Sequence, residues 1–379
     1  MTVPDGSPAI TVPGFTDAHS HLLAASADVP VSWQEASVAD FHRRVASVGC
    51  TPMDVPELPP PSPLRGMAER LRAGLAGAAA AGLVETTEMG VRDWWYLDAL
   101  ALLQRSGPLP LRVRVYLASG LAERAGLAEM AARASSAAHW VSLDGVKFYA
   151  DGWLGPRTCA MCRPFADRGD SGLLFMDAGT LARRIEPFAG RGWRIATHAI
   201  GDRAILAVLD AYELAWGGDL AAISTAAPRI EHASIQSSEI IARMAESGVV
   251  ACIQPSFAVT DAREVRLALA PGLRGTAYPW ADMASAGVRM LAGTDYPHEV
   301  IEPLVGLARL VRGRAERPGF RTSARARQTS RLSLAAAFRL LTDGTAGETL
   351  LSADPRITAA DIDHIEVRGT MPVPFQKAA

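Results

Sequence analysis

Lysine is almost missing from this sequence. Of the 38 basic residues only Lys147 and Lys377 are lysine, and arginine supplies the positive charge everywhere else. Lys377 stands close to the C-terminus, whereas Lys147 lies in an apolar stretch inside the chain. A guanidinium group cannot replace the reactive amine of lysine. A position that stays lysine in such a chain is therefore expected to use the amine itself.

Cysteine, net charge and long apolar runs are scarce as well. Four cysteines in 379 residues are too few and too scattered for a disulfide scaffold. The formal net charge of -2 offers no basic surface for nucleic acid or an anionic membrane. No run approaches the roughly 20 apolar residues that a bilayer crossing needs, and the N-terminal residues lack a secretory signal pattern. We expect a cytoplasmic protein with a small-molecule substrate and neither nucleic acid nor a membrane as partner; a homodimer is left open.

The chain contains short β-type runs that alternate with helical stretches. Hydrophobic residues make up 49% of it, which is enough for a large core. Eight runs are predicted as strands, at residues 9–21, 83–90, 111–119, 144–152, 192–198, 228–234, 248–256 and 287–295. This alternation predicts a parallel sheet. Eight units predict an α/β fold of the (β/α)₈ TIM-barrel type, in which catalytic residues gather at the C-terminal ends of the strands.

The remaining segments fit the alternation less closely. We expect, in chain order, a Pro-rich loop at 52–63, an Arg-rich solvated stretch at 312–333, a helix at 334–342 and a final strand at 362–368. The predicted division is a barrel at 12–345, with 1–11 and 346–379 forming a reduced β-sandwich appendage and tail.

Ligand-type side chains stand at the C-terminal ends of five predicted strands. They are His19, His21, Lys147, His198, His232 and Asp295. His19 and His21 are two residues apart on one strand and therefore face the same way. Neutral imidazole and carboxylate are the usual ligands of zinc and similar ions. We therefore predict a divalent-metal site at this rim, with zinc as the expected ion and one or two ions per chain. The other four histidines (His42, His139, His298 and His364) do not fit this pattern.

Lys147 needs a separate explanation, because an ammonium ion repels a metal cation and is costly to bury unpaired. In one interpretation it forms a buried ion pair, for instance with Asp151 or Asp295. In the other its amine has reacted with carbon dioxide to give a carbamate, an anion with two oxygens that can bridge two metals.

Five segments together resemble a known family. GFTDAHSH, DGVKFYADGWLGPRT, THAIGDRA, RIEHAS and AGTDYP occur in the order typical of the amidohydrolase superfamily. They are most similar to its amidohydrolase-3 branch, which includes N-substituted formamide deformylases, and the resemblance covers roughly residues 12–310. It implies a (β/α)₈ barrel with a small β-sandwich and a centre of one or two metals that activates water.

The resemblance also implies roles for the strand-end residues. His19 and His21 would hold the more buried metal. Carboxylated Lys147 would bridge to a second metal held by His198 and His232. Asp295 would bind metal, act as the general base toward the activated water and then protonate the leaving nitrogen. The implied activity is hydrolysis of a non-peptide C–N bond in an amide, formamide or cyclic amide.

The sequence departs from the family pattern at both ends and in one insert. Only 18 residues precede His19, and the segment between His21 and the second strand is short, which leaves the substrate class open. A deaminase of the same superfamily is one alternative, but the glutamate that deaminases carry after the fifth-strand histidine is missing from the AIGD that follows His198. A retired barrel that binds a small molecule without catalysis is the other.

Four further side chains are candidates for substrate contact. Trp94 follows the second strand and is suited either to an aromatic wall or to helix–barrel packing. Tyr149, Asp151 and Arg157 flank the end of the fourth strand. Arg157 would pair with a substrate carboxylate or, as we favour, brace the loop through Asp151.

Two carboxylates and two thiols are the remaining candidate functional residues. Asp17 and Glu231 stand beside the candidate ligand histidines and are candidates for hydrogen bonds that orient them. Cys159 and Cys162 have metal-like spacing, but no second pair completes a zinc site, so we expect two ordinary thiols.

Overall fold

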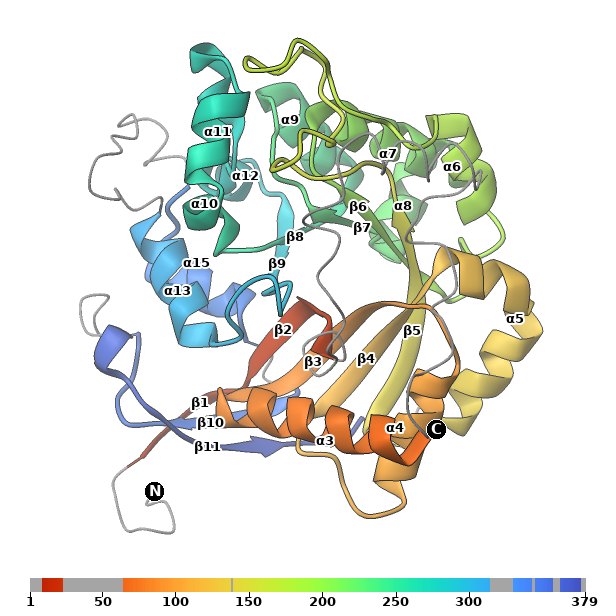
Figure 1. Cartoon of the computed structure of the whole chain (residues 1–379), viewed down its shortest axis with the longest axis vertical. Coiled ribbons are helices and arrows are strands. Elements are labelled where there is room, and N and C mark those ends of the chain that lie inside the picture. The colour runs from red at the N-terminus through yellow and green to blue at the C-terminus, as the bar shows by residue number, and fades with distance from the viewer. Residues whose placement is uncertain are drawn as a thin grey trace.

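The computed structural model describes residues 9–22, 64–137, 139–313, 330–342, 345–356 and 362–375. Within them, an eight-stranded parallel sheet and a three-stranded antiparallel sheet are connected by helices that surround the larger sheet (Figure 1). No helix in these ranges is long and apolar enough to cross a membrane. The Pro-rich segment 52–63 and most of the Arg-rich stretch, 314–329, lie outside them, so those two predictions stay predictions.

The parallel sheet has its strands in sequence order. They are β2 (Phe15–Ser20), β3 (Leu83–Val91), β4 (Arg112–Ala118), β5 (Val141–Tyr149), β6 (Arg194–Ala199), β7 (Arg229–His232), β8 (Val250–Ile253) and β9 (Arg289–Ala292). The segment after β9 returns to β2: the His21 N–H donates to the Tyr296 carbonyl and the Asp295 N–H to the His19 carbonyl, each at 2.7 Å. The sheet is thereby a nearly closed barrel, as the eight-unit pattern predicts.

Helices follow the strands. They are α3 (Leu64–Ala80), α4 (Trp95–Gln104), α5 (Ser119–Ser136), α6 (Ala178–Ile185), α7 (Asp202–Ala215), α8 (Leu220–Ala226), α9 (Ser238–Ser247), α10 (Phe257–Thr260), α11 (Ala262–Ala268), the 3₁₀ turn η2 (Pro271–Thr276), α12 (Trp280–Ser285), α13 (Pro303–Arg312) and α15 (Leu334–Leu340). Asp177, Asp219, Ser237 and Ser333 cap α6, α8, α9 and α15 by accepting a backbone N–H three residues on. The helix predicted at 334–342 is confirmed.

The small antiparallel sheet joins both ends of the described chain in the order β1 (Ile10–Pro13), β10 (Gly347–Leu351) and β11 (Val367–Pro372). The sequence predicted a reduced β appendage built from the two ends of the chain, and this small sheet is of that kind. The final strand predicted at 362–368 is wrong over its first half, because Ile362–His364 form a 3₁₀ turn, η3. Ile362 is buried, and Asp363 pairs with Arg312 of α13 at 2.7 Å, which holds that turn against the barrel. The division of the chain at residues 12 and 345 stays a prediction.

Gly14 separates the two sheets at the point where a single strand was predicted over 9–21. Its N–H donates to the Gly347 carbonyl at 2.8 Å. A Cβ at this position would lie 2.3 Å from Val84 Cγ2 and 2.9 Å from the Gly347 oxygen, so an extra methyl has no space. The chain therefore crosses from the small sheet into the barrel only because residue 14 has no side chain.

Replacing Gly14 by alanine is expected to lower the free energy of unfolding by about 2–3 kcal/mol, the usual cost of overpacking a core. Urea or thermal unfolding measures the effect. Gly77→Ala is the matched control, because Gly77 is an exposed residue of α3 with no atom within 4 Å of the added methyl. That control is expected to stabilise the protein by about 0.5–1 kcal/mol. Equal effects of the two substitutions would contradict the argument for Gly14.

Candidate metal centre

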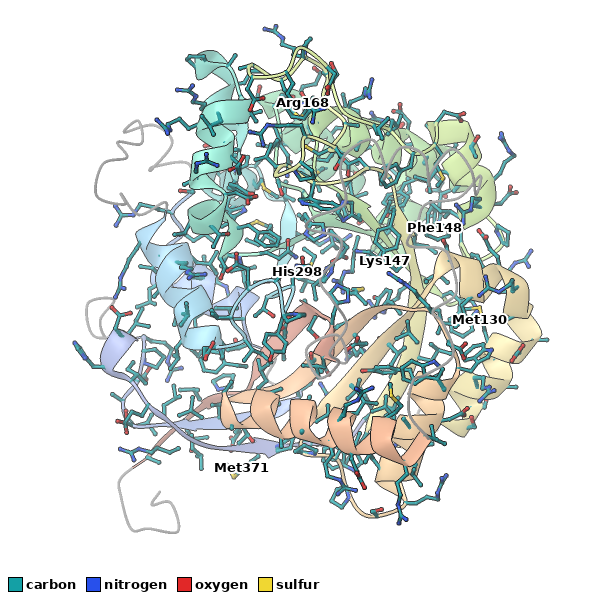
Figure 2. All side chains as sticks on the ribbon, viewed as in Figure 1. Met130, Lys147, Phe148, Arg168, His298 and Met371 are labelled. Atoms are coloured by element: carbon teal, nitrogen blue, oxygen red, sulfur yellow. The ribbon has the colours of Figure 1, made fainter. Side chains whose placement is uncertain are left out.

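The six predicted ligands meet at the C-terminal end of the barrel. His19 lies in β2 and His21 directly follows that strand, Lys147 lies in β5, His198 in β6 and His232 at the end of β7, and Asp295 follows β9. Lys147 lies near the middle of the molecule, as the label in Figure 2 shows, whereas Met371 of the small sheet lies at its edge. The topology thus assembles one cluster from residues that are up to 276 positions apart (295 − 19).

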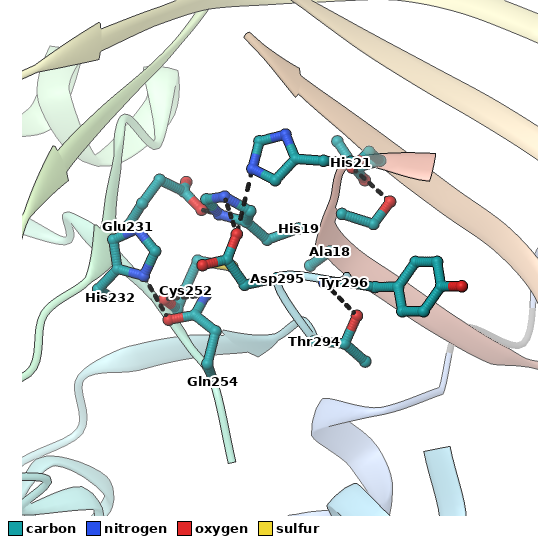
Figure 3. Close-up of polar contacts among 12 residues, drawn as sticks. Ala18, His19, His21, Glu231, His232, Cys252, Gln254, Thr294, Asp295 and Tyr296 are labelled. Carbon is teal, nitrogen blue, oxygen red and sulfur yellow. Dashed lines mark hydrogen bonds and ion pairs between the residues drawn. The ribbon is translucent and has the colours of Figure 1, made fainter. Parts of the chain in front are cut away.

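Asp295 lies between the two histidines of β2. Its Oδ1 is 3.3 Å from His19 Nε2 and 3.1 Å from His21 Nε2, and both rings point toward this oxygen (Figure 3). The potential ligand atoms of the three residues all lie within 4.8 Å of one another. Two imidazole nitrogens and a carboxylate oxygen at this spacing form a donor set suited to zinc or a similar divalent ion.

His198 and His232 extend the cluster away from Asp295. The His198 and His232 ring centroids are 4.5 Å apart, and those of His232 and His19 are 5.0 Å apart. His198 Nε2 is 2.9 Å from the Gly152 carbonyl oxygen, and His232 Nδ1 is 2.8 Å from Gln254 Oε1. Imidazoles from three different strands therefore lie in one continuous group.

Burial favours the neutral form of His19 and His232, which is the form that binds metals. Burial and the nearby Lys147 lower the pKa of His19 to about 4, against an opposing effect of Asp295. Burial and His198 hold the pKa of His232 well below its ordinary value. Burial alone would raise the pKa of the Asp295 carboxyl, but the histidines around it hold that pKa well below its usual range. At neutral pH, His19 and His232 are therefore neutral and lie beside the ionised Asp295 carboxylate.

Lys147 is buried inside the barrel with only 1% of its surface exposed. Its Nζ has no hydrogen-bond partner among the described residues and lies 5.4 Å from the centroid of the Tyr149 ring. Burial lowers the pKa of this amine to about 8. A hydrogen-bonded ion pair with Asp151 or Asp295 is wrong, because Nζ meets neither carboxylate within the described part of the chain.

Asp151 accepts hydrogen bonds from the backbone rather than from Lys147. Its carboxylate accepts the N–H groups of Ala160, Ile200 and Gly201 at 2.8–3.0 Å and lies 3.4 Å from His198 Nε2. These contacts tie the loop after β5 to the loop after β6. Asp151 therefore shapes the rim around His198, and its contact with a substrate stays a prediction.

Arg157 braces the same loop through partners that the sequence did not predict. It pairs with Asp167 at 2.6 Å and with Glu264 of α11 at 2.8 Å, and it donates to the carbonyls of Leu154 and Gly155. The predicted pair with Asp151 is wrong. With its guanidinium engaged by these four partners, Arg157 has little capacity left for a substrate carboxylate.

The two aromatic candidates lie in different surroundings. The Arg133 guanidinium lies 5.0 Å from the Trp94 ring, which packs against the hydrophobic core. The Tyr149 ring lies 5.8 Å from that of His198, inside the cluster. Tyr149 is therefore well placed for the predicted substrate contact, whereas Trp94 is packed in the way that the alternative interpretation describes.

Asp17 and Glu231 support His19 as the sequence predicted. Asp17 accepts the His19 N–H at 3.0 Å and the Thr294 hydroxyl at 2.5 Å, and burial raises the pKa of its carboxyl to about 6. Glu231 Oε2 lies 2.6 Å from His19 Nδ1. One carboxylate thus holds the backbone of His19 and the other holds its ring.

His19, Glu231 and Cys252 form a second group with metal-like spacing. Arg229 already pairs with both oxygens of Glu231, at 2.8 and 3.0 Å. Burial and the Glu231 charge raise the pKa of the Cys252 thiol well above its usual value, so the sulfur keeps its proton. A guanidinium and a thiol at this place disfavour a cation, and we interpret the group as support for His19.

Four residues near the cluster were not identified from the sequence. Arg229 stands two residues before Glu231 on β7, and Cys252 and Gln254 are two residues apart at the end of β8, so strand alternation was the available signal. His298 was set aside among the unrelated histidines, yet its ring centroid lies 6.5 Å from that of His21 and its side chain is exposed (Figure 2). Nothing in the local sequence predicted that contact.

Two cluster residues have left-handed backbone conformations, His232 at φ 71° and Asp295 at φ 59°. Such conformations are rare outside glycine and are common at functional sites. Each residue stands where a strand ends, so the sharp change of direction points its side chain into the barrel mouth. Cys159 and Cys162 are free thiols, as expected.

The chain resembles known proteins in sequence. Residues 51–349 match the amidohydrolase family, Amidohydro_3. YtcJ of Bacillus subtilis (strain 168), whose name assigns it to the amidohydrolases, is 28% identical over 252 residues, which are 61% of this chain and 46% of that protein. The Arabidopsis thaliana protein LONG AFTER FAR-RED 3 is 30% identical over 176 residues, 45% of this chain and 30% of that protein. The chain thus spans less than half the length of these two relatives.

Solved structures share the fold. A metal-dependent hydrolase of uncharacterised function from Pyrococcus furiosus is 22% identical, with a TM-score of 0.68 over 92% of this chain and 88% of that one. A second metal-dependent hydrolase of uncharacterised function, from Pyrococcus horikoshii OT3, is 19% identical. Its TM-score is 0.72 over 93% of this chain and 88% of that one. At such identities the likeness shows the fold alone. The sequence match, which covers most of the chain, shows more: this protein belongs to the amidohydrolase family.

Proposed function

We propose that this protein is a metal-dependent hydrolase that cleaves the C–N bond of an amide, a formamide or a cyclic amide. The observation that carries the proposal is the cluster itself, in which imidazoles surround the Asp295 carboxylate beside the Lys147 amine, which has no hydrogen-bond partner among the described residues. Family membership supports the reaction class. A small molecule is the proposed substrate, and a homodimer stays an untested alternative to a monomer.

The residues present fit a divalent cation, for which zinc is our first choice. His19, His21 and Asp295 would hold one ion, and His198 and His232 would hold a second ion if two are bound. When bound, such an ion activates water and polarises the substrate carbonyl. Four imidazoles and only one carboxylate in the cluster favour zinc over magnesium or calcium, which prefer oxygen ligands.

The orphaned amine of Lys147 fits a carbamate. A neutral amine adds carbon dioxide to form a new N–C bond and releases one proton, which leaves an anionic carboxylate on nitrogen. This change replaces a buried, unpaired cation by an anion that faces the same imidazoles. It removes the electrostatic conflict between Lys147 and a bound cation, and therefore we propose that Lys147 is carboxylated when two ions are bound.

Asp295 is the group that moves the proton. Its carboxylate is ionised and lies at the centre of the cluster, where attacking water would be placed. It would accept the proton of that water and then deliver it to the leaving nitrogen, as a general base and acid. Tyr149, beside His198, is positioned to contact the substrate on the opposite side of the cluster.

Metal removal tests the proposal directly. Dialysis against dipicolinate is expected to reduce amine release from a panel of N-formyl, N-acyl and cyclic amides to the uncatalysed background. Added Zn²⁺, Co²⁺ or Mn²⁺ is expected to restore it, because the ion supplies the activation of water. Purified protein with less than one equivalent of metal, together with unchanged thermal stability in chelator, would instead support a barrel without catalysis.

A further inference from the structure

A buried ion pair lies directly beneath the cluster. Arg229 and Glu231 are two residues apart on β7 and point to the same side of the strand. Arg229 Nε donates to Glu231 Oε1 at 2.8 Å, and its Nη2 donates to Oε2 at 3.0 Å. Glu231 is completely buried, and its Oε2 also faces His19 Nδ1 at 2.6 Å, as Figure 3 shows. Two buried charged groups thus lie in a row behind the ring of a candidate ligand.

The same guanidinium also holds the backbone beside His19. Arg229 Nη2 donates to the carbonyl of Ala18 at 2.7 Å. Arg229 therefore fixes both the carboxylate that contacts the His19 ring and the peptide that carries this residue. The link joins β7 to β2 inside the barrel, so the backbone that carries His19 and the carboxylate that contacts its ring are held by the same guanidinium.

The donor and acceptor chemistry selects one of the two neutral tautomers of the ring. Arginine can only donate, so both oxygens of Glu231 act as acceptors. An acceptor at 2.6 Å from Nδ1 requires that Nδ1 carry the hydrogen. His19 Nε2 then has its lone pair free, and this nitrogen is the one that faces Asp295 Oδ1 at 3.3 Å.

We propose that Arg229 and Glu231 are positioning residues that lock His19 in the tautomer with Nδ1 protonated and thereby prepare Nε2 to bind the metal ion. The inference rests on the proposed metal-dependent function of the same cluster. His19 differs here from His232, whose Nδ1 faces the neutral amide of Gln254. An ionised partner such as Glu231 strengthens the hydrogen bond at Nδ1. It thereby makes the lone pair of Nε2 more basic and a stronger metal ligand.

The tautomer itself is the first measurement. ¹⁵N NMR of histidine-labelled, metal-free wild-type protein is expected to show His19 with a protonated Nδ1 and an unprotonated Nε2, with the signal assigned by its absence in His19→Asn. A wild-type His19 that carries its hydrogen on Nε2 would overturn the inference. This measurement needs no variant at the ion pair, so misfolding of such a variant cannot affect it.

The second measurement is the affinity for Zn²⁺ alone, by competition with a chromophoric chelator. In Glu231→Gln the amide has one acceptor and one donor, so whichever way it turns, its NH₂ faces a donor of Arg229. We expect Zn²⁺ to bind about 10–100-fold more weakly, the usual effect of losing such a partner. The matched control is Glu85→Gln, because Glu85 pairs with Arg112 and Arg114 in the barrel at 2.6 and 2.8 Å without touching a site histidine.

The two outcomes separate the inference from the function. Zn²⁺ affinity within about twofold of wild type is expected for Glu85→Gln, and the same result for Glu231→Gln would overturn the inference while leaving the metal site intact. A wild-type protein that binds no Zn²⁺ would instead count against the proposed function. In that case the NMR result would still decide whether Arg229 and Glu231 set the tautomer.

Discussion

Asp295→Asn is expected to lower kcat by about 10³-fold, within the range that general acid–base groups contribute. Asparagine keeps the shape of the side chain but cannot accept the proton of the attacking water. It also tolerates the left-handed backbone that residue 295 adopts at φ 59°. The loss is therefore expected in catalysis rather than in folding, measured as steady-state turnover of the amide that the metal-reconstitution panel identifies.

The control for this prediction is Asp144→Asn. Asp144 is a carboxylate of β5 that pairs with Arg114 at 2.7 Å, away from the histidines. We expect its turnover to stay within a few-fold of wild type. Turnover of Asp295→Asn above a tenth of the wild-type value, with metal content unchanged, would show that another group moves the proton.

Lys147→Met is expected to have opposite effects on stability and on metal content. Methionine fills a similar volume without an amine, so the metal-free protein loses an unpartnered buried polar group and is expected to become more stable. It also loses the only group in the cluster that can form a carbamate. With bicarbonate present, we expect the metal bound per chain, measured by elemental analysis, to fall by one equivalent relative to wild type.

The stability difference depends on pH in a direction set by the amine. The pKa of Lys147 falls from 10.5 in the unfolded chain to about 8 in the folded protein. Below pH 8 both states are protonated and the full cost of burying the charge is present. Between pH 8 and 10.5 only the unfolded state binds the proton, so the unfolding free energy of wild type rises with pH, by about 3 kcal/mol in all.

Lys147→Met has no amine at this position and is expected to lack this rise. It is therefore the reference against which the wild type is compared. The difference in unfolding free energy between variant and wild type, measured in CO₂-free buffer, is expected to shrink as the pH increases from 8 to 10.5. A constant difference over that range would mean that Lys147 is not buried as a charged amine. Equal metal content in both proteins would contradict the carbamate.

The barrel and its rim could be predicted from the sequence because both depend on local periodicity. Alternation of strand-like and helical runs is a property of neighbouring residues, and the barrel closes with strands in sequence order. His198 and His232 were therefore placed at one rim without any knowledge of their contacts. The structure bears out that common placement through the centroid distance of 4.5 Å.

Contacts between distant segments could not be predicted in the same way. Arg157 was matched with Asp151, the carboxylate closest in sequence, but its partners are Asp167 and Glu264, and the latter lies on a helix 107 residues away. The segment 362–364 forms a 3₁₀ turn in which Ile362 is buried and Asp363 pairs with Arg312 of α13. In both cases the contacts join segments that are far apart in the chain.

The hydrogen bonds that close the barrel also involve the cluster. The His19 carbonyl accepts from the Asp295 N–H, so the seam between the first and the last barrel strand passes through two candidate ligands of the same ion. An ion bound there would act as a cross-link between the two ends of the barrel, with a long loop closed behind it. During synthesis the seam cannot form until residue 295 has left the ribosome, so binding of an ion by both ends of the barrel would come late, when most of the fold has already been made.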